Sequence, residues 1–498
     1  MTTPDWVKDA IFYQIFPDRF ARSKRNPAGN LLYEPWDTPP TVHGFKGGDL
    51  YGVAEKLDYL HNLGITAIYL NPIFASASNH RYHTYDYYNV DPILGGNDAL
   101  KVLLAEAHQR GMKIVLDGVF NHASRGLWQF HHVLETGAAS PYRNWFHFDE
   151  ERLSGKKRWG AYPGTGELRA LQSGESSLKA IGYQGWWNLP ALPKFNTATP
   201  TVRAFLFDIA EHWIKFGIDG WRLDVAAEID DDSFWQEFRR RVRAINPNAY
   251  IVAEIWHEAQ RWLQGDQFDA TMNYLVTAAA LPFFSGKHID MRVVNQAGGY
   301  NGRVPAEISA HDFANEIDRL LHLYQPDITY AQLNLLDSHD TPRFLSCARG
   351  DTDSLKLAWL FMLTFPGAPC IYYGDEVGVD GEHDPYCRKS FPWDEAGWNR
   401  DLLDYLKSAI SLRKSHPSLR RGTFSRLWSA DGVYAFGRAQ DGESLVAAFN
   451  VSEEPRTIEV QYEAKKQPKP LFGQPSDVAR IENRLRVTVP ARSGVVLG

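Results

Sequence analysis

The chain of 498 residues is too long for one ordinary hydrophobic core, so it predicts two or three domains or one large barrel with additions. Its 60 acidic and 53 basic residues leave no basic field for nucleic acid or for an anionic membrane surface. The N-terminal stretch lacks the features of a signal peptide, and no apolar segment is long enough to span a membrane, so we expect a cytoplasmic protein. Three cysteines without CxxC spacing exclude a disulfide framework.

Short apolar runs alternate with stretches of helical periodicity along most of the chain, a pattern typical of βα units and a parallel sheet. Helical patterns such as those at 99–111, 202–217 and 233–246 separate the runs. Eight runs are candidate strands, at residues 11–16, 67–72, 113–120, 220–225, 250–255, 270–275, 332–339 and 369–376. Since eight parallel strands close a barrel, we predict a (β/α)8 TIM barrel of the α/β class.

Two regions depart from a plain barrel. Residues 122–196, after the third strand, are rich in Gly, Trp and polar residues and are too long for a simple βα loop. They predict an inserted subdomain on the face where barrels build their sites. Residues 417–498 contain VYAFGRA, SLVAAFNV, RTIEVQY, RLRVTV and GVVL, separated by polar turns, which predict a small antiparallel β-sandwich. Residues 1–121 and 197–416 then form the two parts of the barrel.

Polar side chains interrupt the apolar strands at their C-terminal ends. Because these ends converge on one mouth of a barrel, we expect Asp224, Glu254 and Asp340 to face one another. Three carboxylates in one pocket repel unless the site separates their pKa values. The polar residues at strand ends are Asp117, Asn121 and His122 after the third strand, Arg222 and Asp224 in the fourth, Glu254 in the fifth, and Asp337, His339 and Asp340 in the seventh.

The carboxylates suit glycoside hydrolysis. Arg222 shares a strand face with Asp224 and is expected to keep it ionised. Glu254 is flanked by Ile255 and Trp256, so apolar surroundings and like charges are expected to keep it protonated. A retaining glycosidase needs such a nucleophile and acid, with their carboxyls about 5 to 5.5 Å apart. Aromatic residues, at 13% of the chain, also suit the apolar faces of sugars, although large cores use aromatics too.

Simpler readings exist for each feature alone. Arg222 with Asp224 is more often a structural ion pair, and a carboxylate such as Glu254 can belong to an ordinary loop. His83, His122 and His339 could form a metal site, because barrels also host metal hydrolases. No HxH or HExxH spacing occurs, however. The joint occurrence at successive strand ends favours the glycosidase.

The motifs resemble those of the α-amylase family of glycoside hydrolases. DGVFNH (117–122), GWRLDV (220–225), AEIW (253–256) and LLDSHD (335–340) are similar to its four sequence regions, in order. LPKFN (192–196), FKGGDL (45–50) and GAPCIYYGDEVG (367–378) are similar to its flanking regions. The resemblance implies that Asp224 is the nucleophile, that Glu254 is the general acid and base, and that Asp340 binds sugar hydroxyls and favours the distorted ring.

The resemblance also implies substrate-binding residues. Arg222 would orient Asp224, His122 and His339 would hydrogen-bond the sugar in subsite −1, and Tyr82 would stack against that sugar. His83 stands where many relatives have Asp, so its contacts there are expected to differ. The other candidate substrate-binding residues are Asp117, Lys194, Glu228, Trp256, His257 and Arg343.

GVFNH, EIWHEA (254–259) and LPKFN are most similar to the cyclomaltodextrinase, neopullulanase and maltogenic amylase subgroup. Glu228 of VAAEI matches the Glu of a VANE stretch in those enzymes, but Ala227 replaces the Asn, which can alter acceptor preference. Typical members carry an N-terminal β-sandwich module that helps form a dimer and covers the neighbour's site, whereas the first strand here begins at residue 11. We therefore expect a short form with a more open cleft, like the shorter neopullulanase-like debranching enzymes, and either a monomer or a homodimer.

The expected substrate is an α-glucan with α-1,4 and also α-1,6 bonds, such as a cyclodextrin, maltooligosaccharide, pullulan or branched glucan. No cofactor is expected to be required. Asn121 sits where family members often place a calcium ligand, but the Lys-His pair of calcium-dependent amylases is absent from VAAEI. The stretch ARSKRNPAGN (21–30) is basic where calcium-binding relatives carry carboxylates. A structural calcium ion is therefore not expected.

Two other functions are compatible with the resemblance. A dedicated transglycosylase or sugar isomerase forms the same covalent intermediate and differs on the acceptor side, around Glu228, Trp256, His257 and Lys194. Non-catalytic relatives that serve as transporter subunits lack part of the carboxylate set and carry a membrane segment. Neither feature is found here, so the hydrolase is favoured over this last function.

Overall fold

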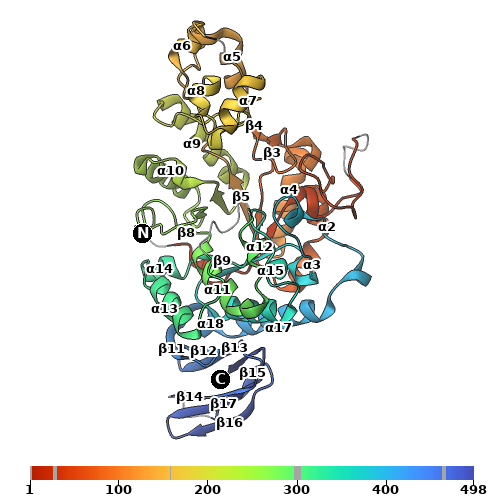
Figure 1. Ribbon diagram of the computed structural model, residues 1–498, viewed down its shortest axis with the longest axis vertical. Helices are drawn as coiled ribbons and strands as arrows, with labels where there is room; N and C mark the ends of the chain where they lie inside the picture. Colours follow the sequence, from red (N-terminus) through yellow and green to blue (C-terminus); the bar gives the residue numbers. More distant parts are fainter. Residues whose placement is uncertain (1–2, 26–30, 158, 297–303, 463–466) are drawn as a thin grey trace.

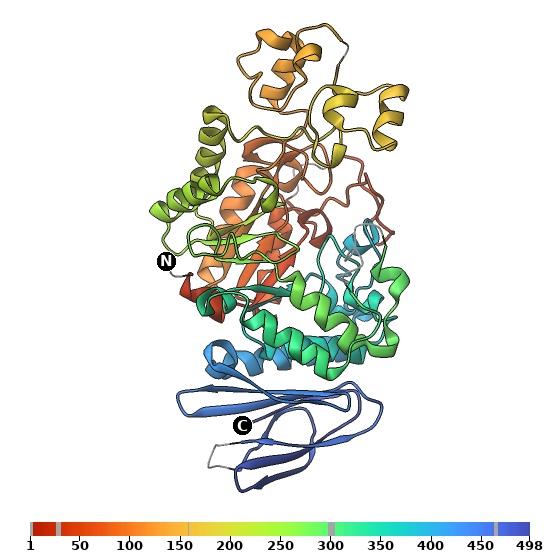
Figure 2. The same ribbon diagram turned by 60° about the vertical axis from the view of Figure 1, so that its left-hand side comes forward.

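The computed structural model describes residues 3–25, 31–157, 159–296, 304–462 and 467–498. Three parts follow one another along its long axis: a helical subdomain, a barrel, and antiparallel sheets at the opposite end (Figures 1 and 2). Residues 26–30 of the basic stretch considered for calcium binding lie outside the described residues. Within the described ranges, no helix combines the length and apolar character needed to cross a membrane.

Eight parallel strands form the barrel. They are hydrogen-bonded in the order β8-β7-β6-β5-β2-β1-β10-β9, and a parallel bridge between Met272 and Leu333 joins the two ends. Both faces of the strands are buried, which explains their nearly continuous apolar sequences. Each strand overlaps the run predicted for it, so the TIM barrel is confirmed. The strands are β1 (Phe12–Ile15), β2 (Ala67–Leu70), β5 (Lys113–Gly118), β6 (Gly220–Leu223), β7 (Tyr250–Ala253), β8 (Ala270–Thr271), β9 (Leu333–Leu335) and β10 (Ala368–Tyr372).

Helices cover the outside of the barrel, and several of them bury a single apolar stripe. In α4 (Gly96–Gln109), the buried residues Leu100, Leu103, Leu104 and Ala107 recur at the spacing of one helix face. The other long helices are α9 (Pro200–Phe216), α10 (Asp232–Ile245), α11 (Tyr274–Ser285), α13 (Ala310–Leu321), α16 (Thr352–Thr364) and α17 (Arg400–Ser415). Shorter elements are α1 (Pro17–Phe20), α2 (Leu50–Glu55), α3 (Leu57–Leu63), α12 (Met291–Val294), α14 (Pro326–Thr329), α15 (Phe344–Cys347), α18 (Pro417–Arg421) and the hairpin of β3 (Phe74–Ser76) with β4 (Thr84–Val90).

The predicted inserted subdomain lies between β5 and α9. It contains α5 (Trp128–Thr136), α6 (Glu150–Leu153), α7 (Thr165–Gln172) and α8 (Ser177–Ile181). An isolated antiparallel bridge between His122 and Lys194 ties the end of the insertion back to its start. The Phe130 ring packs at 5.0 Å from both Phe146 and Tyr183 and forms a small aromatic core. The exact domain limits at residues 121, 196 and 416 stay predictions.

Two antiparallel sheets form the C-terminal sandwich. They enclose a separate apolar core that includes Val433, Ala435, Ile458 and Val487. The first sheet is β11 (Thr423–Ala430), β12 (Val433–Gln440), β13 (Glu443–Asn450), β18 (Ser493–Leu497) and β15 (Pro470–Phe472); the second is β14 (Arg456–Gln461), β17 (Arg484–Val489) and β16 (Ser476–Ile481). The predicted sandwich is confirmed, with β11, β15 and β16 as strands that the sequence did not indicate.

Two buried arginines lie close together where the barrel meets the sandwich, and both donate to the carbonyl of Leu419. Arg413 on α17 donates to the carbonyls of Leu363 and Gly367 at 2.9 and 2.6 Å. Arg438 on β12 donates to the carbonyl of Thr364 at 2.6 Å. Leu363 and Thr364 end α16, where carbonyls lack helical partners, so the two guanidinium groups complete that helix end. Burial lowers the pKa of Arg413 to about 9 and that of Arg438 to about 10, so both are charged at neutral pH.

Candidate active site

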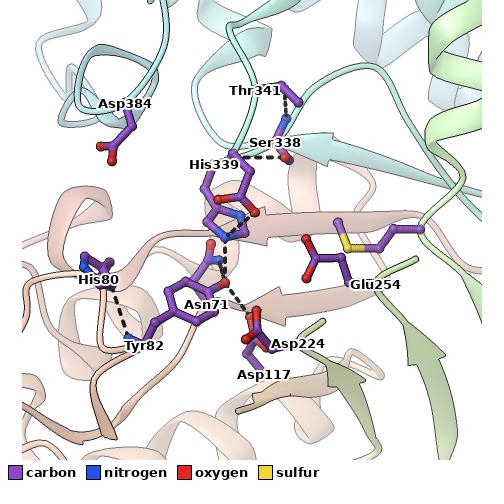
Figure 3. A network of polar contacts seen from close by, with 12 residues as sticks. Asn71, His80, Tyr82, Asp117, Asp224, Glu254, Ser338, His339, Thr341 and Asp384 are labelled. Atoms are coloured by element: carbon purple, nitrogen blue, oxygen red, sulfur yellow. Dashed lines mark hydrogen bonds and ion pairs between the residues drawn. The ribbon is translucent and has the colours of Figure 1, made fainter. Parts of the chain in front are cut away.

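The guanidinium of Arg222, on β6, contacts three carboxylates at the C-terminal ends of neighbouring strands. Its Nη1 lies 2.9 Å from Asp117 Oδ1 and 3.0 Å from Asp224 Oδ1, and its Nη2 lies 3.0 Å from Glu254 Oε2. Its Nε donates to Met272 Sδ at 3.3 Å. Because Arg222 is fully buried, these pairings are needed to offset the loss of its hydration. Asp117, Asp224 and Glu254 thus surround one cation at the mouth of the barrel. Figure 3 shows the positions of the three carboxylates.

Burial and neighbouring charges set the pKa values of Asp224 and Asp117. Burial raises the pKa of Asp224 well above its usual value, the charge of Glu254 raises it further, and Arg222 opposes both effects. Burial also raises the pKa of Asp117 to about 6, against the lowering effect of Arg222. The net effect on the pKa of Asp224 is upward, so Arg222 does not by itself offset the burial of this carboxylate.

The prediction that Glu254 has apolar surroundings is wrong. Besides Arg222, its carboxylate accepts hydrogen bonds from the indole Nε1 of Trp256 and from the backbone N–H of Val225, both at 2.9 Å. The apolar neighbour Ile255 is buried in the core instead, because successive side chains of an extended segment point in opposite directions. Glu254 is therefore held in place by three polar partners.

A strained backbone at Val225 supplies one of these partners. Val225 directly follows Asp224 and has φ 39° and ψ 45°, a left-handed conformation that β-branched residues rarely adopt. Such a conformation costs on the order of 1–3 kcal/mol and persists only where the surroundings enforce it. Here it ends β6 and directs the Val225 N–H to Glu254, so the turn after the nucleophile candidate positions the acid candidate.

Tyr82 and His339 form a second layer around Asp117. The Tyr82 hydroxyl donates to Asp117 Oδ2 at 2.8 Å and lies 2.6 Å from His339 Nε2 (Figure 3). The two rings stack with centroids 5.5 Å apart. Gln14 Nε2 lies 2.8 Å from His339 Nδ1, and these contacts fit a neutral imidazole that accepts at Nδ1 and donates from Nε2. Burial also lowers the pKa of His339 well below its usual value.

Asp340 stands apart from the pair, on the rim of the site. Its carboxylate lies 3.1 Å from His339 Nε2 and 3.3 Å from Arg388 Nη2, and its side chain is 31% exposed. Arg388 also donates to the carbonyl of His339 at 2.8 Å and pairs with Asp384 at 3.2 Å. Arg388 therefore fixes the backbone of His339 and the carboxylate of Asp340.

His83 and His122 line the site as neutral rings. Burial lowers the pKa of His83 to about 4 and that of His122 to about 3. The His83 ring meets His80 edge-on at 5.1 Å, and the His122 ring stacks on Trp186 at 5.1 Å. At neutral pH such imidazoles can each donate and accept one hydrogen bond, which suits sugar hydroxyls better than ions.

Three residues predicted for the acceptor side make two separate contacts: Lys194 with Glu228, and Trp256 with Glu254. Lys194 Nζ lies 3.3 Å from Glu228 Oε2 and donates to the Glu228 carbonyl at 2.9 Å. Trp256 donates to Glu254 while its ring stacks on Tyr274 at 3.7 Å. The predicted acceptor side thus contains an ion pair and an aromatic ring.

Two predicted substrate-binding residues are not part of this network. His257 is exposed, and its Nδ1 lies 2.9 Å from the carbonyl of Glu258. Arg343 is fully buried, pairs with Asp375 at 2.6 Å and donates to the carbonyl of Cys387 at 3.0 Å. The structure gives Arg343 a role in packing the loop after β10.

Several contacts of the site involve residues that the sequence argument did not single out. Gln14 and Asn71 lie in the apolar runs of the first two strands, so the rule of polar residues at strand ends could have found them. Asn71 Nδ2 donates to the Tyr82 hydroxyl at 3.2 Å. Asp384 lies in an irregular loop and Arg388 ends the short 3-10 helix Tyr386–Arg388 that follows, and both are too short for a periodic signal.

Comparisons with known proteins point to one enzyme family. The family model of the alpha amylase catalytic domain matches residues 14–422, which contain all three carboxylates. A cyclomaltodextrinase of Geobacillus thermopakistaniensis (strain MAS1) is 43% identical over 467 residues, which cover 93% of this chain and 72% of that protein. The debranching enzyme of Nostoc punctiforme superposes with a TM-score of 0.89 at 46% identity, covering 100% of this chain and 99% of that one. The cyclic alpha-maltosyl-(1→6)-maltose hydrolase of Arthrobacter globiformis has a TM-score of 0.84 at 34% identity, with 100% of both chains covered.

Proposed function

This chain belongs to the alpha-amylase family, and we propose that it is a retaining hydrolase of α-glucans. The observation that carries the proposal is the position of Asp224 and Glu254 at adjacent nitrogens of one guanidinium, each 3.0 Å away. A shared guanidinium keeps the two carboxyls close, as in retaining glycosidases, whereas inverting enzymes hold them farther apart to admit a water molecule.

In the first step, Glu254 acts as the general acid and transfers a proton to the glycosidic oxygen. Asp224 attacks the anomeric carbon as the bond to that oxygen breaks, which gives a glucosyl ester of Asp224 and releases the remaining chain with a free hydroxyl. Arg222 stays next to both carboxylates and compensates their charge throughout. Asp340, on the rim, is placed to accept hydrogen bonds from sugar hydroxyls.

In the second step, the ester is hydrolysed. Glu254, now a carboxylate, takes a proton from water, whose oxygen attacks the anomeric carbon and frees Asp224. Two inversions restore the α configuration. If a sugar hydroxyl enters beside Lys194 and Glu228 in place of water, the same step yields a transfer product, so some transglycosylation is expected at high substrate concentration.

The relatives support both α-1,4 and α-1,6 cleavage, because their names include a cyclomaltodextrinase, a debranching enzyme and a hydrolase of a cyclic (1→6)-linked maltosyl sugar. The test is product analysis on β-cyclodextrin, pullulan, soluble starch and a branched maltooligosaccharide, with Asp224→Asn as the blank. NMR of the first product should show the α anomer before mutarotation. An initial β anomer, or no cleavage of any of these glucans, would contradict the proposal.

We further propose that activity requires no tightly bound calcium. Calcium takes 6–8 oxygen ligands. Asn121 Oδ1 is buried without a hydrogen-bond partner, but in the described part of the chain no group of three or more His, Cys, Asp or Glu side chains could hold a metal. We expect EDTA to leave kcat and Tm unchanged, with added CaCl2 as the reversal control. A fall in either quantity that calcium restores would show that a calcium site exists.

A further inference from the structure

A column of three stacked rings leads from the site to the surface of the subdomain. His122 stacks on Trp186 with centroids 5.1 Å apart and planes 15° apart, and Trp186 stacks on Trp187 at 4.4 Å and 11°. His122 is buried, Trp186 is half-buried and Trp187 is 73% exposed. Since Trp186 covers one face of the Trp187 indole, this exposure leaves the opposite face open to solvent.

The backbone holds Trp187 in this position against its own preference. Trp187 and Asn188 have φ values of 51° and 59°, in the left-handed region that non-glycine residues seldom adopt. The turn is fastened by Asn188 N–H donating to the Gly185 carbonyl at 3.1 Å and by Asn188 Oδ1 accepting from Ser177 N–H at 2.8 Å. Strain and a large exposed ring both disfavour the folded chain, so their coincidence points to a binding role.

The turn also has little freedom to rearrange. A Cβ at Gly185 would lie 2.4 Å from the Leu189 carbonyl oxygen, so this close backbone approach requires glycine. Gly185 pairs with Pro193, and Trp186 N–H donates to the Leu192 carbonyl at 2.9 Å. The tip that presents Trp187 is therefore anchored to the segment that leads into Lys194.

This anchoring decides which side of the site the column serves. Lys194 pairs with His122 through a backbone bridge and with Glu228 through its side chain. Lys194 and Glu228 are two of the residues predicted for the acceptor side. Asp340 and Arg388, in contrast to Lys194, contact His339. The column therefore extends from the cleaved bond toward the acceptor side, where the released part of the glucan chain lies.

We propose that the open face of Trp187 is a binding platform for a glucosyl unit of the leaving part of an α-glucan chain, several sugars from the cleaved bond. The proposal rests on the proposed hydrolysis of α-glucans. A flat apolar indole face complements the C–H face of a neutral pyranose, and the exposed position selects long or branched chains over short ones. His122 and Trp186 act as the rigid support of that face.

The test compares Trp187→Ala with Trp128→Ala in the full chain. Trp128, on α5, is also exposed, at 59%, but its ring packs on Tyr142 instead of the column. We expect Trp187→Ala to lower kcat/KM on a long branched glucan roughly tenfold while changing kcat/KM on maltotriose by about twofold at most. Trp187→Phe should keep most of the activity on the long substrate, and Trp128→Ala should match the parent on both.

A binding measurement separates this proposal from the hydrolysis itself. In the Asp224→Asn background, a long glucan should quench tryptophan fluorescence, and Trp187→Ala should weaken that binding. Equal binding and equal kcat/KM ratios for Trp187→Ala and Trp128→Ala would overturn the platform while leaving the hydrolase intact. A concentration-dependent dimer in sedimentation that Trp187→Ala dissociates would overturn it in favour of contact with a second copy. A parent that cleaves no α-glucan would contradict the hydrolase, and the fluorescence titration would still decide on the platform.

Discussion

Asp224→Asn is expected to lower kcat on α-glucans by a factor on the order of 10⁴ to 10⁶, because the amide cannot form the glucosyl ester. The fold should be unaffected. The carboxylate of Asp224 is buried beside Glu254, and both effects disfavour its ionised form in the folded protein. A neutral amide of the same shape removes this cost, so Tm should stay equal to that of the parent or rise slightly. Steady-state kinetics on soluble starch and thermal unfolding followed by circular dichroism measure the two quantities.

Asp117→Asn is the matched control. Asp117 lies 2.9 Å from the same guanidinium as Asp224 but is 1% exposed and is covered by the hydroxyls of Tyr69 and Tyr82, so it cannot reach a sugar. It should act by positioning Arg222 and Tyr82, with a loss of roughly 10- to 100-fold. If the two variants lose equal activity, or if Asp224→Asn stays within about a hundredfold of the parent, Asp224 is not the nucleophile.

The barrel and its carboxylates could be predicted because both follow from local pattern. Strands buried on two faces appear in the sequence as continuous apolar runs. A polar residue inside such a run therefore indicates a position at the mouth of the barrel, where the active site forms. Asp224 and Glu254 stand out for this reason. Gln14 and Asn71 carry the same signal in the first two strands, and the rule applied evenly would have included them.

The contacts around Glu254 could not be predicted, since they depend on tertiary geometry. Arg222 reaches carboxylates of three neighbouring strands, which no spacing along one strand reveals. The left-handed turn at Val225 is equally invisible, because Val is a residue that sequence rules place in extended structure. The flanking residues Ile255 and Trp256 suggested an apolar pocket, but one points into the core and the other presents its N–H.

The sandwich was only partly predictable for a related reason. Strands β12, β13 and β17 bury alternate or successive residues against a core and therefore show a clear apolar pattern. Strand β11 has no fully buried residue and contains a register shift between Arg426 and Trp428. An edge strand of this kind is formed by its hydrogen bonds to β12, so its composition carries little signal.

Glu254→Gln separates the role of the acid from that of the nucleophile by the choice of leaving group. On soluble starch we expect kcat to fall by a factor on the order of 10² to 10⁴, because the glycosidic oxygen leaves without a proton. α-Maltosyl fluoride needs no protonation of its leaving group, so formation of the maltosyl ester of Asp224 should stay fast. The following hydrolysis lacks its base and should be slow, which predicts a burst of fluoride followed by a slow phase.

Mass spectrometry of the quenched burst should show the sugar on Asp224. Glutamine preserves the hydrogen bond from Trp256 to Oε1, so the loss reports the missing proton and not a displaced side chain. Asp224→Asn, in contrast, should give no burst with the fluoride. Equal losses on starch and on the fluoride in the Glu254 variant would exclude Glu254 as the acid, and Asp340, whose carboxylate is the most exposed of the three, would become the candidate for that role.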